Sequence, residues 1–233
     1  MSHRLEEDFE TRRREVELFL RYLQIAAGAG AGWIPATSVA PLTVEESEEV
    51  YRTVKASALL LLYNLIESTA TGIVHAIFDA IRDGRHAFAD VRHEIRRVVY
   101  EQVKNHASVD DFVAMHDVAV ELLLIGFRKE ALFSGNVDAR KLRSTANAYG
   151  FSHSLGDQHV NTEHILAVKS RRNDLAHGTK SFAEVGRDYT PSQLEEIKTH
   201  VVHYLHAIVK NVVEYLRNSQ FLAVNARSNT SQD

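Results

Sequence analysis

Residues 57–68 read SALLLLYNLIES, and this stretch decides the fold. Wound as a helix, it is apolar around almost its whole circumference, so it needs neighbours on most sides. Thr43 followed by Glu46 resembles a capping box, and apolar residues at helical spacing continue from there to about Ile81. The pattern therefore predicts a long central helix in a helical bundle.

Further segments show the same helical periodicity of apolar residues. They cover residues 5–25, 88–106, 108–127, 136–150 and 161–177. Gly150 and Gly178 mark the ends of the last two, because a helix C-terminus favours a glycine. A final helix begins at Thr190 as the cap, with Pro191 at the first helical position and Gln193 three residues after the cap.

The composition favours an all-α fold. The chain has 11 Gly and 3 Pro in 233 residues, too few for the many tight turns of a β-sandwich or barrel. Residues 26–42 are rich in Gly and Ala and contain two of the prolines, which predicts an irregular loop or arm. Residues 223–233 are predicted to form a flexible polar tail. No stronger linker is evident, so residues 1–222 are predicted to form a single helical domain.

Several classes of protein and site are excluded or disfavoured. The chain has no Cys, which excludes disulfides, iron–sulfur clusters, thiolate zinc sites and cysteine nucleophiles. The first residues, MSHRLEEDFE, are charged where a signal peptide is apolar, and the most apolar stretch, 56–66, is about half a membrane span. We therefore expect a cytoplasmic protein without a membrane partner. With 27 Lys+Arg against 31 Asp+Glu, any contact with nucleic acid must be local.

Two other patterns are interpreted as structural. Residues 28–32 read GAGAG, but no strand is evident before them, whereas a phosphate-binding glycine loop connects a strand to a helix. A flexible loop is the favoured interpretation. His200, His203 and His206 stand three apart, but no H-E-x-x-H motif and no second ligand cluster of defined spacing accompanies them. Solvated or interface histidines are the favoured interpretation, and no metal or cofactor is expected.

Residues 169–178, KSRRNDLAHG, differ in kind from these patterns. They bring two arginines, an amide, a carboxylate and a histidine together just before a helix-ending glycine. On composition alone, a solvated face is favoured: Asp174 pairs with one arginine, and His177 suits the helix C-terminus. Surface charge clusters of this kind are common and mostly inert.

A family resemblance changes that interpretation. Arg172, Asn173 and His177 match the R-polar-x-x-x-H motif of the HEPN superfamily, helical domains many of which are metal-independent ribonucleases. YNLIEST, FSGNVDARKLR, RRNDLAHG followed by SFAEVGRDYT, and the closing helix resemble its stand-alone prokaryotic MAE-type branch. The resemblance covers most of the chain. It implies an up-and-down helical bundle with additional helices and one irregular arm.

The resemblance makes Arg172, His177 and Asn173 the catalytic candidates. Cleaving RNA without a metal requires a base for the ribose 2′-hydroxyl, an acid for the leaving 5′-oxygen and a cation for the phosphorane. Histidine suits both proton transfers, because its ordinary pKa lies near neutrality. Arginine suits the third task, because its planar fork grips two phosphate oxygens. Asn173 would position a phosphate, a ribose or the imidazole.

Three neighbours are assigned to substrate binding, namely Arg171, Asp174 and Lys169. Arg171 would add attraction for the RNA backbone. Asp174 either orients the motif histidine or pairs with Arg171, and the sequence leaves both roles open. Basic residues within 92–97 and 140–143 are expected on solvated faces, with an extended RNA groove as the alternative.

The spacing of the motif also bears on the oligomeric state. Positions five apart on a straight helix differ by about 140° around the axis and about 7.5 Å along it, so Arg172 and His177 of one chain do not share a face. Either the helix is distorted, or two copies meet around a two-fold axis. HEPN nucleases resemble the second case, which implies a homodimer with a composite active site and RNA as the partner.

The resemblance further implies a toxin or antiviral defence effector held in check by an antitoxin or another regulatory protein. One departure concerns Thr179: toxins silenced by a nucleotidyltransferase antitoxin carry tyrosine at this place, two residues after the motif histidine. Two other hypotheses remain. One is a catalytically inactive HEPN module that binds nucleotide, RNA or a partner protein. The other is a purely structural helical adaptor in which the motif is a coincidence.

Overall fold

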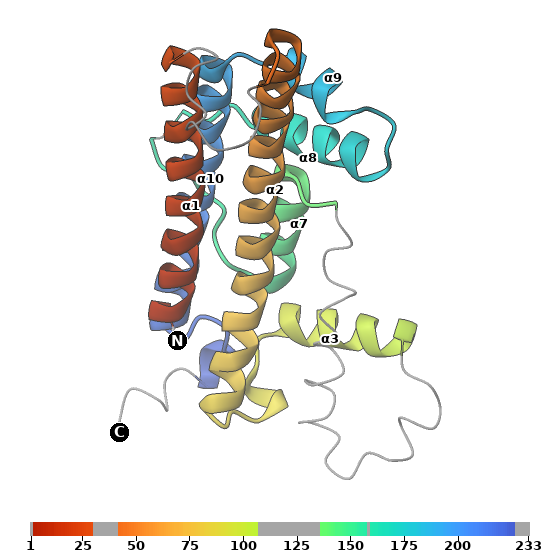
Figure 1. The fold of residues 1–233 in the computed structure, drawn as a ribbon. Helices are drawn as coiled ribbons and strands as arrows, with labels where there is room; N and C mark the ends of the chain where they lie inside the picture. The colour runs from red at the N-terminus through yellow and green to blue at the C-terminus, as the bar shows by residue number, and fades with distance from the viewer. Residues whose placement is uncertain (1, 30–41, 107–135, 158, 227–233) are drawn as a thin grey trace. The chain divides into compact units, whose positions relative to one another are not determined.

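The structure is a computed structural model that describes residues 2–29, 42–106, 136–157 and 159–226. Every regular element in these ranges is helical, and the one β pairing within them is an isolated bridge between Val91 and Leu222. The elements are α1 (Ser2–Ala29), α2 (Val44–Asp83), η2 (Phe88–Asp90), α3 (His93–His106), α7 (Ala139–Tyr149), α8 (Glu163–Ala176), α9 (Phe182–Arg187) and α10 (Pro191–Arg217) (Figure 1). The predicted all-α class is confirmed.

The two longest predicted helices after the arm are capped as the sequence indicated. At the start of α2, the Thr43 hydroxyl accepts from the N–H of Glu46, whose carboxylate accepts from the N–H of Thr43 at 2.7 Å. Thr190 and Gln193 make the same reciprocal pair at the start of α10. α1 continues past the predicted end to Ala29, because three of the last four residues are alanine, the strongest helix former, which outweighs the single glycine among them.

Some expectations fall on residues that the structure does not describe. The predicted helix over 108–127 and the arm over 30–41 lie outside the described residues. Of the predicted tail, residues 223–226 are described. The N–H of Ala223 donates to the carbonyl of Asp90 at 2.7 Å, and a helical turn follows over 224–226. The rest of the predicted tail, residues 227–233, lies outside the described residues.

Contacts divide the described residues into two compact units. Unit 1 takes its residues from 1–8, 67–157 and 206–233, and unit 2 from 9–66 and 158–205. Since α1, α2 and α10 each contribute to both units, neither unit is a continuous stretch of sequence. The single domain over residues 1–222 stays a prediction.

In unit 1, α3 and α7 pack with the later part of α2 and the later part of α10. Each helix contributes side chains that are fully removed from solvent, among them Ile77 from α2, Ile95 from α3, Leu142 from α7 and Val212 from α10. Within each helix, the buried residues recur every three or four positions, so each helix presents one apolar face. Burial of such faces supplies the main driving force for folding of the unit.

Arg92 fastens several segments of unit 1. Its guanidinium forms two hydrogen bonds of 2.9 Å to the carboxylate of Glu94, and it also donates to the carbonyls of Gly150 and Gln220. Gly150 caps α7 with a φ of 78°, and a Cβ there would lie 2.2 Å from Cζ of Arg92. Arg92 therefore has a structural role, and neither the solvated face nor the RNA groove proposed for residues 92–97 applies to it.

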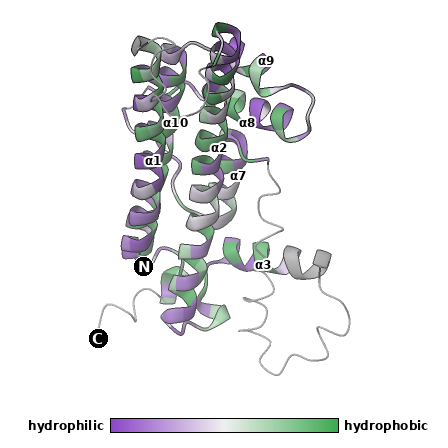
Figure 2. Ribbon diagram, viewed as in Figure 1, coloured by the Kyte–Doolittle hydropathy of each residue, from purple (hydrophilic) through white to green (hydrophobic). Residues whose placement is uncertain are grey.

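In unit 2, α8 and α9 lie beside the first part of α2 (Figure 1). The core includes Leu59 and Leu62 from α2, Val168 from α8, Val185 from α9 and Val201 from α10, all fully buried. Apolar and polar residues are interspersed along α10 (Figure 2), and the apolar residues recur every three or four positions, as in an amphipathic helix. The unit thus positions α8, which carries the KSRRNDLAHG segment, on an apolar base.

α2 is the central helix predicted from SALLLLYNLIES. Leu59, Leu62 and Ile66 are each 0% exposed. By length and composition alone, α2 could cross a membrane, but 56% of its most apolar 18-residue window is buried within the structure. That degree of burial is typical of the core helix of a globular protein.

Candidate functional site

The KSRRNDLAHG segment forms the second half of α8 and the turn that follows it. Val168 and Leu175 are buried and hold this half of the helix on the core of unit 2. The four residues from Arg171 to Asp174 are half-buried, and His177 is exposed. The polar side chains of the segment therefore lie at the boundary between the core and solvent.

α8 ends in a Schellman motif. His177 is the C-cap, and its N–H still donates to the carbonyl four residues earlier at 3.0 Å. Gly178 follows with a φ of 67°, and the N–H groups of Gly178 and Thr179 donate to the carbonyls of Leu175 and Asp174. The predicted stop at Gly178 is confirmed, and the helix is regular as far as His177.

Arg171 is held by a network of polar contacts. Its Nη1 donates to Oδ2 of Asp174 at 3.1 Å, and its Nε donates to the hydroxyl of Tyr189 at 3.3 Å. A carboxylate oxygen of Asp188 lies 3.9 Å from Nη2. The hydrogen bond that Arg171 donates to Tyr189 raises the pKa of Arg171 most, burial acts against it, and the hydrogen bond to Asp174 raises the pKa further. Of the two roles left open for Asp174, the structure shows the pair with Arg171.

Arg172 stacks on an aromatic ring from α2. Its Cζ lies 4.8 Å from the ring centroid of Tyr63, a cation–π contact worth on the order of 0.5–1 kcal/mol at an exposed site. Its Nη1 also donates to Oδ1 of Asn173 at 3.1 Å. Stacking uses the face of a guanidinium, whereas its N–H groups lie in the plane of the group. Asn173 is thus a partner of Arg172 in this structure.

His177 has different surroundings. Its side chain is exposed at the end of α8, and it makes no hydrogen bond or ion pair with any residue that the structure describes. Because the helix is regular, the relation between Arg172 and His177 is that of an ordinary helix, about 140° around the axis and about 7.5 Å along it. The two side chains therefore leave the helix on different sides. Lys169 is half-buried one turn before Arg172.

The structure adds contacts that sequence analysis missed. Lys55 on α2 is 8% exposed, and its Nζ donates to the carbonyl of Tyr189 at 2.8 Å and lies 5.1 Å from the ring centroid of Tyr51. Burial lowers the pKa of Lys55. Tyr63 and Tyr189 both occur in segments that carry the family resemblance, which was the available signal for a role beside the motif.

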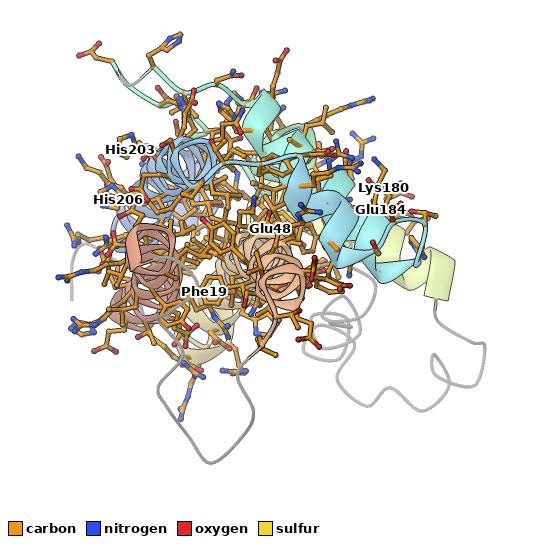
Figure 3. All side chains as sticks on the ribbon, turned by 45° about the horizontal axis from the view of Figure 1, so that its top comes forward. Phe19, Glu48, Lys180, Glu184, His203 and His206 are labelled. Atoms are coloured by element: carbon orange, nitrogen blue, oxygen red, sulfur yellow. The ribbon has the colours of Figure 1, made fainter. Side chains whose placement is uncertain are left out.

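α9 was also missed. Ser181 caps it by accepting from the N–H of Glu184 at 3.2 Å, while the carboxylate of Glu184 accepts from the N–H of Ser181 at 2.7 Å. The spacing of Ser181 and Glu184 is the signature of a capping box and was readable in the sequence. Figure 3 shows Glu184 and Lys180 at the outer side of this segment. α9 carries the chain from the end of α8 to Tyr189.

Residues 1–221 match the model of the family described as MAE_28990-like HEPN. No curated protein and no solved structure matches the chain. The matched range includes the whole of α8 and the turn that ends it, together with residues of both units.

Proposed function

We propose that this chain, which belongs to the MAE_28990-like HEPN family, is a metal-independent endoribonuclease. Members of HEPN families are usually ribonucleases. The observation that carries the proposal is the end of α8: an exposed imidazole at His177 follows a guanidinium at Arg172 that is held on the ring of Tyr63. These two groups are the base or acid and the cation that RNA cleavage requires.

In the proposed reaction, the imidazole of one His177 removes the proton of a ribose 2′-hydroxyl. The 2′-oxygen attacks the adjacent phosphorus, and the bond from phosphorus to the 5′-oxygen breaks. A second imidazole, in its protonated form, gives its proton to the leaving 5′-oxygen. The products are a 2′,3′-cyclic phosphate and a 5′-hydroxyl, and proton transfer of this kind contributes about 10²- to 10⁴-fold to the rate.

Arg172 stabilises the charge that develops on the phosphorane. Its in-plane N–H groups can contact two non-bridging oxygens, and its charge persists at any working pH. Arg171 has less to offer, because Asp174 and Asp188 already lie against it. In this proposal, Arg171 and Asp174 hold the motif helix against Tyr189, and Asn173 orients Arg172.

The proposed enzyme is a homodimer. Since α8 is regular to His177, one chain places Arg172 and His177 on different faces of the helix. Two copies related by a two-fold axis would bring two imidazoles and two guanidinium groups to one phosphodiester. A two-fold interface is self-complementary, so the end of each α8 would contact its mate.

We place the enzyme among toxins or defence effectors that a partner protein restrains. The hydroxyl of Thr179 donates to the carbonyl of Asp174 at 3.0 Å and so belongs to the helix end. No tyrosine hydroxyl stands at that place as an acceptor for a transferred nucleotide. Restraint by a bound protein therefore fits this chain better than restraint by nucleotidyl transfer.

The test is cleavage of mixed RNA by the purified full chain in excess EDTA, with analysis of the RNA ends. We expect 2′,3′-cyclic phosphates, and we expect His177→Ala and Arg172→Ala to lower the rate by about 100-fold or more. His206→Ala is the matched control, because His206 is also exposed on a helix but lies on α10. Cleavage that His177→Ala leaves unchanged contradicts the proposal. Intact RNA with a dimeric, folded protein supports the inactive binding module.

A further inference from the structure

A second cluster of polar side chains lies at the start of α8. His164 belongs to the first turn of α8, while Glu196 and His200 lie one turn apart on α10. All three residues belong to unit 2, and each offers a possible metal-ligand atom within 4.8 Å of the other two. Along α8, His164 is about 20 Å from His177. The cluster is therefore separate from the site proposed for RNA cleavage.

The contacts within this cluster are close but incomplete. Nε2 of His164 lies 3.7 Å from a carboxylate oxygen of Glu196, too far for a hydrogen bond. The rings of His164 and His200 are stacked, with centroids 4.8 Å apart and planes at 15°. The side chains of His164 and Glu196 are accessible to solvent, with exposed fractions of 21% and 61%.

Four imidazoles lie in and around this cluster. Burial, and then the neighbouring imidazole of His164, lowers the pKa of His200, while Glu196 acts in the opposite direction. His159 and His203 act on His200 in the same direction as His164, so all four imidazoles lie in one neighbourhood.

We propose that His164, Glu196 and His200 bind a divalent transition-metal ion of the zinc class. Two imidazoles and one carboxylate are a common donor set for zinc. Spacing of four residues puts Glu196 and His200 on one face of α10, and α8 supplies the third ligand. Water, His159 or the exposed His203 (Figure 3) can complete a tetrahedral shell.

Binding requires two small rearrangements. The N–H of Asn161 donates to Nδ1 of His200 at 3.2 Å, and an ion bound at Nδ1 would replace that hydrogen bond. Asn161 is exposed, so its N–H would then bond to water. The stacked rings would also turn, so that the lone pairs of His164 and His200 converge on one point. Both changes take place at the surface and leave no buried polar group without a partner.

The ion would join the start of α8 to α10. It would stabilise the helix that carries the RNA-cleaving motif, but it would take no part in the chemistry proposed there. Sequence analysis found no second ligand cluster beside the histidines of α10, because His164 comes from a different helix and only the fold brings it close. Because the ion takes no part in RNA cleavage, the metal-binding proposal and the ribonuclease proposal can be tested independently.

The test is calorimetric titration of the metal-free full chain with Zn²⁺. We expect one ion per chain and a rise in melting temperature on binding. His164→Ala, Glu196→Gln and His200→Ala should each weaken binding about tenfold or more, whereas His206→Ala on the same helix should not change it. Co²⁺ in place of Zn²⁺ should give the visible absorption of a four-coordinate site, and Glu196→Gln should abolish that absorption.

Either of two results overturns the proposal. One is the absence of stoichiometric Zn²⁺ binding by the wild-type chain. The other is Zn²⁺ binding of the same affinity in Glu196→Gln, which changes an exposed side chain and should leave the fold intact. Circular dichroism of each variant separates lost ligands from lost structure, so a histidine variant that unfolds does not decide the outcome.

Discussion

Tyr149 and Tyr215 have very different surroundings for their hydroxyl groups. The hydroxyl of Tyr215 donates to the carbonyl of Tyr149 at 2.7 Å in a buried setting. The hydroxyl of Tyr149 is itself buried and has no hydrogen-bond partner among the described residues, while its ring packs edge-on against Phe78. Burial raises the pKa of Tyr149. The hydroxyl of Tyr215 is thus hydrogen-bonded, whereas burial of the hydroxyl of Tyr149 lowers the free energy of unfolding.

This contrast predicts opposite effects of the same chemical change. Tyr215→Phe leaves a buried carbonyl without its donor and should lower the free energy of unfolding by about 1 kcal/mol. Tyr149→Phe removes an unsatisfied hydroxyl and should leave that free energy unchanged or raise it. Urea denaturation of both variants checks the prediction. A larger loss of stability in Tyr149→Phe than in Tyr215→Phe would contradict the assignment of the two hydroxyls.

Glu94 predicts a pH dependence of stability. Its hydrogen bonds from Arg92 lower the pKa of the carboxyl to about 2 from its ordinary value of 4.5. A carboxyl whose pKa is lowered by folding stabilises the protein above its unfolded pKa, and that stabilisation is lost as the pH falls through the folded value. The loss therefore falls between about pH 4.5 and pH 2.

Glu94→Gln isolates this contribution. The variant should be less stable than the wild type at neutral pH, and the difference should shrink as the pH falls toward 2. Because the side chain is partly exposed, we expect a small effect. Melting temperatures across this pH range measure it. If the difference in melting temperature between the wild type and Glu94→Gln grew as the pH fell, it would contradict a carboxylate that is stabilised by Arg92.

At the scale of residues, the sequence predicted local pairs better than distant ones. The pair of Arg171 with Asp174 follows from a spacing of three on one helix, and it was among the alternatives considered. The stacking of Arg172 on Tyr63 joins residues far apart in sequence, and only the fold places that ring under the guanidinium. The identity of the motif residues was therefore readable, but their partners on α2 were not.

At the scale of elements, α9 shows how a short helix is fixed to its neighbour. Gly186 is buried in α9, and a Cβ there would lie 1.8 Å from the backbone oxygen of Arg52 on α2. The atoms that the added Cβ would meet belong to the backbone of Arg52, so a side-chain rotation cannot relieve the contact. α9 also precedes Tyr189, whose hydroxyl and carbonyl bind Arg171 and Lys55.

Gly186→Ala should therefore force α9 away from α2. We expect a loss of about 1–3 kcal/mol in the free energy of unfolding, as for an overpacked core. Gly72→Ala is a matched control, because Gly72 is also helical but a Cβ there would meet only the end of the Leu5 side chain, at 3.2 Å. At residue 72, the greater helix propensity of alanine over glycine should offset the cost of that contact. Equal stability of the two variants would contradict the close approach of α9 and α2.

Periodicity and caps predicted the helices unevenly. The ends of α7 and α8 followed from their glycines, since each glycine adopts a left-handed conformation that other residues avoid. α9 was missed because its six residues are too few to show a helical period. The end of α1 was missed because alanine and glycine carry no apolar pattern, although alanine extends a helix.

At the scale of the whole molecule, composition and periodicity were sufficient for the fold class, whereas the family followed from the resemblance of the motif and its flanking segments. The division into two units was not predicted, since it depends on contacts between distant segments. The homodimer was predicted from the spacing of Arg172 and His177 together with the resemblance, and it stays a prediction. The regular end of α8 agrees with the helical spacing on which that prediction depends.

The central claim is that two chains together build one RNA-cleaving site, and mixing two inactive variants tests it most directly. A heterodimer of Arg172→Ala and His177→Ala keeps one guanidinium and one imidazole, on different chains. Because this heterodimer lacks the second imidazole, which acts as the acid, we expect co-refolding to restore cleavage of RNA to 2′,3′-cyclic ends only in part, but above the rate of either variant alone. His177→Ala mixed with the double variant should stay inactive. Heterodimers that form but show no restored cleavage, when the wild-type chain is active, would contradict it.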